Sequence, residues 1–166
     1  MMERVRNLKV QIQRNKKDIA IIIVWTIVIS LIIIKTHQFF YLDNEQFSVY
    51  KIPYLQYAGP TFTEFDRLLL LATSFLVGVI LVDIKNIVYG YFVSMFLSSL
   101  IAVVYVFIYI WFTLELAETL SRLPFGWELA LFFGIANVFR FMIPAGVLFC
   151  LIGVLTGNLI RTMLKP

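Results

Sequence analysis

Four long apolar runs, separated by short polar stretches, dominate the pattern of this chain. They cover residues 19–35, 63–84, 86–114 and 127–160. Each run is continuous rather than alternating; the first two have 17 and 22 residues, close to the roughly 20 that a helix needs to cross a bilayer, and the last two have 29 and 34, more than a bilayer needs. Because the bilayer core offers backbone groups no water to bind, such runs fold as helices. The sequence therefore predicts an all-α integral membrane protein, with four transmembrane helices in one membrane domain.

Polar segments of different character connect these runs. Residues 1–18 contain six of the fourteen Lys and Arg residues, with Val5, Leu8 and Ile12 at helical spacing. This segment is either a basic amphipathic helix on the membrane surface or a solvated anchor. Residues 36–62 are rich in aromatic side chains, which a disordered linker would avoid. The remaining pieces are an outer turn and a short tail, residues 115–126 and 161–166.

Small residues form a stripe along the third run, which has no charged residue. The members of this stripe are spaced four positions apart and share one helical face: Gly90, Ser94, Ser98 and Ala102. The fourth run carries a similar stripe, spaced by four, three and four positions: Gly146, Cys150, Gly153 and Gly157. Small residues let helices approach closely in lipid. We predict that both stripes form helix-packing interfaces, either within the bundle or against another protein.

The second run has a clear start and a further small-residue pair. Thr63 and Asp66 form a signal close to a capping box, and Ser74 and Gly78 repeat the small-xxx-small pattern. Only a few residues separate this run from the third. The two helices are therefore expected to form a tight antiparallel hairpin.

Arg140 stands out because it lies inside the fourth apolar run. It precedes Arg161 by 21 residues, or roughly 31 Å along a straight helix, which places it at the outer interface. There it either snorkels or pairs with Glu115 or Glu118, or it binds an anionic substrate or a lipid head group.

Proline and length indicate that the last run is not one straight helix. The run is too long for a single perpendicular span, and Pro144 predicts a break near residues 140–144. Residues 127–140 then form a separate interfacial helix. The third helix likewise extends past the membrane, into a cluster of aromatic residues around 105–112.

The distribution of Lys and Arg predicts the orientation. Four spans put both termini on one side, and nine of the fourteen basic residues fall on that side. The positive-inside rule then places both termini in the cytoplasm and the aromatic-rich loop outside. The location that follows is the cell membrane, as a multi-pass protein of the plasma membrane.

Composition excludes several kinds of chemistry. The chain is 61% hydrophobic and 14% charged, and its basic residues flank apolar runs, so we expect no nucleic-acid partner. One cysteine, Cys150, cannot form an intrachain disulfide or a multi-cysteine metal site. One histidine, His37, cannot supply paired haem ligands or a Ser-His-Asp triad, and it is interpreted as a surface side chain. We predict no metal, no cofactor and no enzymatic activity.

Two functional hypotheses remain. The first is a non-catalytic accessory or scaffold subunit of a larger multi-subunit membrane complex, which contacts membrane lipids and packs against other subunits through small-residue helix faces. The alternative is a small-solute or ion transporter or channel that acts as a homo-oligomer. Such a protein usually carries polar groups at mid-membrane, and Ser94, Ser98 and Ser99 are the candidates.

Overall fold

The described part of the chain is built from helices joined by turns. The computed structural model describes residues 2–43, 61–113, 122 and 124–164. Three helical stretches in it are long and apolar enough to cross a membrane: Lys16–Gln38, Ile84–Phe112 and Gly126–Met163. Helix α3 (Glu64–Ile80) is shorter, at 17 residues or about 26 Å. This architecture is compatible with a multi-pass membrane protein.

Helix α1 is one continuous helix of 42 residues, Met2–Asp43. The sequence predicts a span over 19–35 and a loop after Lys35, but the structure continues the helix for two more turns. A charged residue ends an apolar run without ending a helix, and neither Gly nor Pro follows before Pro53. The Thr36 hydroxyl donates to the Ile32 carbonyl at 2.8 Å, as it can within a regular helix. Residues 44–60 of the expected loop lie outside the described residues.

Only residues 81–83 join α3 to α4 (Ile84–Ile108), as the sequence predicts, but the two helices do not form a tightly packed hairpin, because α1 lies between them. A capping box starts α3: the Thr63 side chain accepts from the Asp66 amide, and the Asp66 carboxylate accepts from the Thr63 amide. The carboxylate of Asp83 accepts from the Lys85 amide and starts α4. A π-helical turn, η2 (Tyr109–Thr113), continues α4 at its far end.

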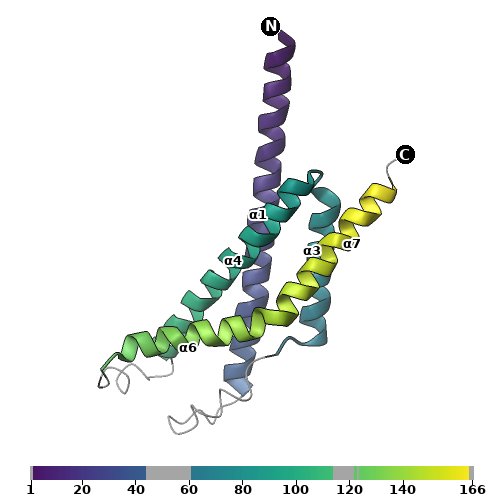
Figure 1. Cartoon of the computed structure of the whole chain (residues 1–166). Helices are drawn as coiled ribbons and strands as arrows, with labels where there is room; N and C mark the ends of the chain where they lie inside the picture. The colour runs from purple at the N-terminus through teal and green to yellow at the C-terminus, as the bar shows by residue number, and fades with distance from the viewer. Residues whose placement is uncertain (1, 44–60, 114–121, 123, 165–166) are drawn as a thin grey trace.

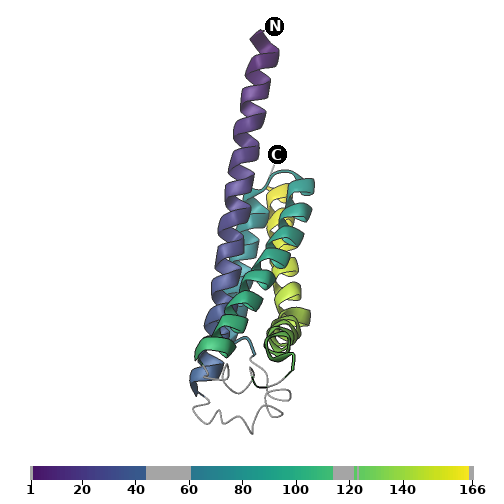
Figure 2. The ribbon, with the colours of Figure 1, turned by 90° about the vertical axis from the view of Figure 1, so that its left-hand side faces the viewer.

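The last apolar run bends, as its proline predicts. Helix α6 (Gly126–Phe141) is followed by the turn η3 (Met142–Gly146) and by α7 (Val147–Met163). Ile143 has φ −106° and ψ 123°, which is extended rather than helical backbone, as expected for a residue before proline. Figures 1 and 2 show that α6 runs across one end of the bundle, transverse to α1, whereas α7 runs back along α3.

The helices pack in a ring around a buried core. Helix α1 lies between α3 and α4, α7 packs along α3, and α6 packs across α4. The N-terminal part of α1 extends beyond all the other described helices, and the C-terminal end of α7 lies at the same end of the bundle (Figure 1). Large side chains that are almost fully buried fill the centre: Trp25, Ile29, Ile33, Leu70, Leu81, Val106 and Val138.

Candidate functional site

A line of buried polar side chains follows the inner face of α1. Five of them are less than 9% exposed: Asp18, Thr26, Ser30, Thr36 and His37. We call this line, together with the side chains that it contacts on α3 and α4, the polar seam. His37 is fully buried, so its interpretation as a surface side chain is wrong. Because α1 continues past Lys35, His37 stays on the packed face, one turn beyond Ile33.

One end of the polar seam is centred on the Asp66 carboxylate, which is 2% exposed. Lys35 Nζ lies 3.0 Å from Asp66 Oδ1, and the Thr63 hydroxyl donates to Oδ2 at 2.6 Å. The Lys35 ammonium also lies 5.3 Å from the centre of the Phe65 ring. Lys35 therefore pairs with α3, and the buried charge of Asp66 is compensated from two helices.

The opposite end of the polar seam, at Asp18, joins α1 to the start of α4. The Asn86 side chain donates to the Asp18 carboxylate at 2.6 Å. Nearby, the Arg161 guanidinium of α7 donates to the Leu81 and Val82 carbonyls that end α3, at 2.9 Å for Val82. Asp18 and Lys35 are 17 positions apart, or about 26 Å, which is close to the roughly 30 Å thickness of hydrocarbon. Charged groups therefore bracket an apolar zone of membrane dimensions.

Hydroxyl and indole groups occupy the middle of the polar seam. The Trp25 indole donates to the Ser74 hydroxyl at 3.2 Å, which joins α1 to α3. The hydroxyl oxygens of Thr26 and Ser94 are 3.1 Å apart, which joins α1 to α4. The Thr26 hydroxyl also donates to the Ile22 carbonyl at 2.8 Å. These contacts tie three helices together at mid-span, where hydrogen bonds between helices have no water to compete with them.

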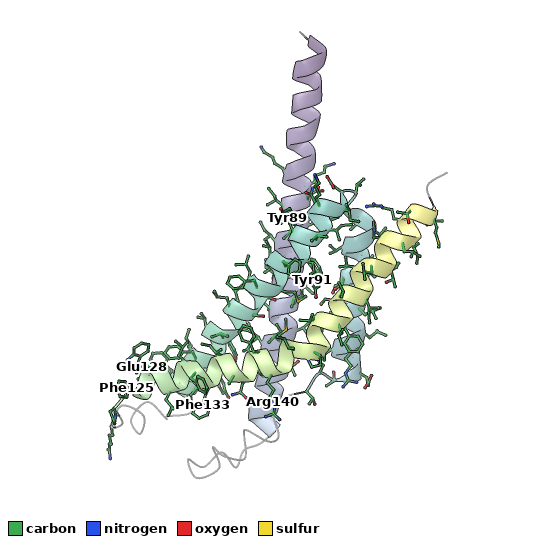
Figure 3. The ribbon with its side chains drawn as sticks, viewed as in Figure 1. Tyr89, Tyr91, Phe125, Glu128, Phe133 and Arg140 are labelled. Atoms are coloured by element: carbon green, nitrogen blue, oxygen red, sulfur yellow. The ribbon has the colours of Figure 1, made fainter. Side chains whose placement is uncertain are left out.

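The small-residue stripe of α4 faces α1. All four of its members are buried: Gly90, Ser94, Ser98 and Ala102. A Cβ added at Gly90 would lie 2.9 Å from Ile22 Cγ1, so this glycine admits the α1 side chain. From the next residue, the Tyr91 hydroxyl donates to the Val147 carbonyl at 3.1 Å and so reaches α7 (Figure 3).

The stripe of α7 faces α3, so the two stripes contact different neighbours. A Cβ at Gly157 would lie 2.2 Å from the Phe75 carbonyl oxygen, and one at Gly153 would lie 2.6 Å from that of Leu71. On the opposite helix, a Cβ at Gly78 would lie 2.3 Å from the Val154 carbonyl oxygen. Backbone therefore meets backbone, which only glycine allows.

The first two members of the α7 stripe, Gly146 and Cys150, pack against side chains rather than backbone. A Cβ at Gly146 would lie 3.0 Å from Met142 Sδ and 3.3 Å from the Phe62 ring. Cys150 is fully buried and contacts the Ser74 hydroxyl. All eight residues of the two stripes are thus buried within this chain's own helix bundle, and of the eight only Gly90 also lines one of the two surface grooves described below.

A third small-residue stripe escaped the sequence reasoning. Its members Gly126, Ala130 and Gly134 are buried on α6 at intervals of four, and the larger Val138 continues the same buried line. A Cβ at Gly134 would lie 3.4 Å from the Val103 carbonyl oxygen of α4, within ordinary contact. The spacing alone could have revealed this stripe, and it explains how α6 crosses α4 closely.

Arg140 lies in the last turn of α6 and is exposed (Figure 3). Its expected partners, Glu115 and Glu118, lie outside the described residues. Among the residues that the structure does describe, no group of three or more His, Cys, Asp or Glu side chains could hold a metal ion.

Two apolar grooves mark the outer surface of the bundle. The first, of about 470 Å³, lies between α1 and α4; we call it the α1–α4 groove. Its lining is Ile19, Ile22, Ile23, Thr26, Ile27, Tyr89, Gly90, Val93, Leu97 and Ile101. The second, of about 410 Å³, lies between α4 and the bend that joins α6 to α7; we call it the elbow groove. Both volumes are in the range of ligand pockets.

Comparison of this chain with protein-family models, with curated proteins and with solved structures found no match.

Proposed function

We propose that this chain is a non-catalytic accessory or scaffold subunit of a larger membrane complex, and that the α1–α4 groove binds one transmembrane helix of a partner. Branched aliphatic side chains form most of the lining, which also includes the small residues Gly90 and Thr26. In lipid, helices associate where small residues let a neighbouring helix approach closely. Ile22 packs against Gly90 and itself lines the groove, whereas the glycine stripe of α7 is already covered by α3.

The projecting part of α1 supports the same proposal. Residues 2–15 continue α1 beyond the other described helices (Figures 1 and 2). At 3.6 residues per turn, 18 positions make five whole turns, so Val5 has the same angular position as Ile23 in the groove. Ile12 lies only about 20° away. By helical spacing alone, Val5 and Ile12 of the arm therefore follow the same stripe as Ile23, and one long partner helix can follow both the arm and the groove.

Charge indicates what kind of partner helix would fit. The first 18 residues contain six Lys and Arg residues and only two acidic residues, Glu3 and Asp18. A partner helix that extends along the arm would gain from acidic residues where it leaves the membrane. With the arm on the cytoplasmic side, as the distribution of basic residues predicts, these acidic residues belong to the partner's cytoplasmic end.

Photocrosslinking in native membranes tests the proposal. Benzoylphenylalanine placed at Ile23 or Ile27 should crosslink to another protein, which mass spectrometry then identifies. The same probe at Leu155 or Leu159 of α7 is the matched control. All four side chains are similarly exposed, at 53%, 50%, 56% and 53% respectively. Equal crosslinking at all four positions, or none at Ile23 and Ile27, would show that the groove holds no partner helix.

Purification of the complex separates the proposal from an oligomer of this chain alone. Gentle extraction of the tagged full chain should recover other membrane proteins in fixed proportion, and the same proteins should appear in the crosslinks. If the chain purifies alone, and Ile23 crosslinks only to a second copy of itself, then the subunit proposal fails.

The polar seam is the observation that supports a second candidate function, a small-solute or ion transporter or channel that acts as a homo-oligomer. Its buried hydroxyl groups lie between two charged ends, as groups along a pathway would. Liposome flux assays of the purified chain, together with Thr26→Val and Ser94→Ala variants, test this candidate. Flux that both variants reduce would favour transport, whereas no flux in the parent protein would favour the subunit proposal.

A further inference from the structure

The elbow groove differs from the α1–α4 groove in the side chains that line it. Eleven residues form its lining: Phe92, Met95, Phe96, Ser99, Leu100, Val103, Ile135, Phe139, Met142, Ile143 and Val147. Ser99 is the single lining residue smaller than valine. The lining comes from α4, from α6 and from the bend before α7, which belong to two of the apolar stretches long enough to cross a membrane. A hydrocarbon environment is therefore the one that this groove suits.

The large side chains of the lining favour a thin, flexible occupant. Phe92, Phe96 and Phe139 are 65%, 66% and 47% exposed, so large rings project around the groove. A helix packs closely against small residues, and this lining presents no stripe of them. An acyl chain needs no such stripe because it can bend between the rings. Apolar surfaces of this kind are covered by lipid tails as readily as by protein side chains.

Arg140 is next to the elbow groove along the chain, although its own side chain is not among the lining residues, and it lies at the end of the bundle where Lys35 pairs with Asp66. It follows the lining residue Phe139 and comes three residues before Ile143. The bend is tied to the outer end of α3, because the Phe62 ring lies against Gly146, next to the helix start that holds Asp66. Figure 1 shows α6 across this same end of the bundle. Lys35 and Asp66 place the outer edge of the apolar zone here.

We propose that the elbow groove binds one acyl chain of an anionic phospholipid, whose phosphate group contacts the Arg140 guanidinium. Arginine matches the geometry of phosphate oxygens and is always charged. The rings along the groove hold the tail on the membrane side of α6, while the head group remains at the interface. This site is independent of the partner helix proposed for the α1–α4 groove, since the two grooves share no lining residue.

Arg140 also has a competing structural explanation. A basic residue in the last turn of a helix interacts favourably with the helix dipole, whatever the lipid composition. That role predicts a change in stability when Arg140 is replaced, but no dependence on the charge of the lipid. Lipid selectivity is therefore the readout that separates the two roles.

Native mass spectrometry of the full chain provides the test. The protein is reconstituted in nanodiscs of equal parts phosphatidylglycerol and phosphatidylcholine, released into mild detergent, and the retained lipids are counted. The parent should prefer phosphatidylglycerol, and Arg140→Gln should reduce that preference about three- to fivefold, as for an exposed charge pair. Arg67→Gln, at the same end of the bundle on α3, is the control for loss of a charge.

A second pair of variants tests the groove itself. Ser99→Phe fills the elbow groove and should reduce the retention of both lipids. Leu129→Phe puts the same ring at an exposed position of α6 outside the lining, about three turns from Arg140, and should change nothing. If Ser99→Phe does not fold, Ile143→Trp, at an exposed lining position, replaces it.

Several results would overturn the proposal. Equal retention and selectivity in the parent, Arg140→Gln and Ser99→Phe would show that the elbow groove holds no lipid. An equal loss of selectivity in Arg67→Gln would show a general charge effect. Displacement of phosphatidylglycerol by soluble glycerol phosphate would show that the phosphate group binds without the acyl chain, and the groove would then have no role.

Discussion

The packing of α7 on α3 gives a quantitative prediction, because the two backbones touch at glycine. In Gly157→Ala, the new Cβ would lie 2.2 Å from the Phe75 carbonyl oxygen and 3.1 Å from the Val79 amide nitrogen. Both are backbone atoms, so no side-chain rotation relieves the overlap. The helices must separate by about 1.2 Å to restore a contact of 3.4 Å. Gaps of this size lose a quarter to a half or more of each dispersion contact along the interface.

The expected magnitude follows from two opposing effects. Overpacking of a tight interior costs about 1–3 kcal/mol, and this site belongs in the upper part of that range because backbone must move. Replacing glycine by alanine within a helix stabilises the helix by up to about 1 kcal/mol. We therefore expect Gly157→Ala to lower the free energy of unfolding by about 2 kcal/mol.

Gly134→Ala is the matched control for this prediction. It is the same substitution in a helix of the same bundle, but its Cβ would lie 3.4 Å from the nearest atom. Only the helix-propensity term remains, so its stability should rise by up to about 1 kcal/mol. The change in the free energy of unfolding for Gly90→Ala should lie between those of Gly157→Ala and Gly134→Ala. The atom that its Cβ would meet at 2.9 Å is Ile22 Cγ1, a side-chain atom that can move.

The chain's one cysteine provides the assay. Cys150 is fully buried beside the α3–α7 interface, so a thiol-reactive fluorogenic dye reports the opening of that interface on heating. A difference of about 3 kcal/mol between Gly157→Ala and Gly134→Ala corresponds to roughly 6–12 °C in Tm for a chain of this size. If the two variants melt at the same temperature, the backbone contact of α3 with α7 is not as close as described.

Three further predictions concern the polar seam and the orientation. Lys35→Gln should cost about 1–2 kcal/mol, between the values for exposed and buried pairs, and adding Asp66→Asn should recover part of that loss in the same melting assay. Ser74→Ala should cost about 0.6 kcal/mol and shift the Trp25 fluorescence, measured with the other two tryptophans replaced by phenylalanine. In Lys85→Cys, the new thiol should react with an impermeant maleimide only from the cytoplasmic side, while the native Cys150 stays buried. Labelling from the outside would show that the predicted orientation is wrong.

Much of the helix order could be predicted from the sequence because apolar runs and proline act locally. The short connection after α3 and the bend near Pro144 depend on short-range signals of this kind, whereas the packing of α1 between α3 and α4 does not. The end of α1 was missed because Lys35 marks the limit of hydrophobicity rather than the limit of helical backbone. In a helix that continues, His37 remains on the packed face.

The partners of each stripe could not be predicted, because spacing shows which residues share a face but not which helix covers it. Gly153 and Gly90 have the same pattern, yet one meets the backbone of α3 and the other a side chain of α1. The salt bridge of Lys35 with Asp66 joins residues 31 positions apart, and no local rule connects them. The grooves are further still from local pattern, since each depends on the angle between two helices.

The continuity of α1 has a mechanical consequence. Its 42 residues form a rod of about 63 Å without a joint among them. Asp18, Thr26 and Lys35 are fixed on that rod, and each engages a different partner side chain. Rotation of α1 about its own axis would break all three contacts together, so the three contacts are mechanically coupled. A rotation imposed on the projecting arm would therefore also displace Lys35 from Asp66, about 26 Å beyond Asp18.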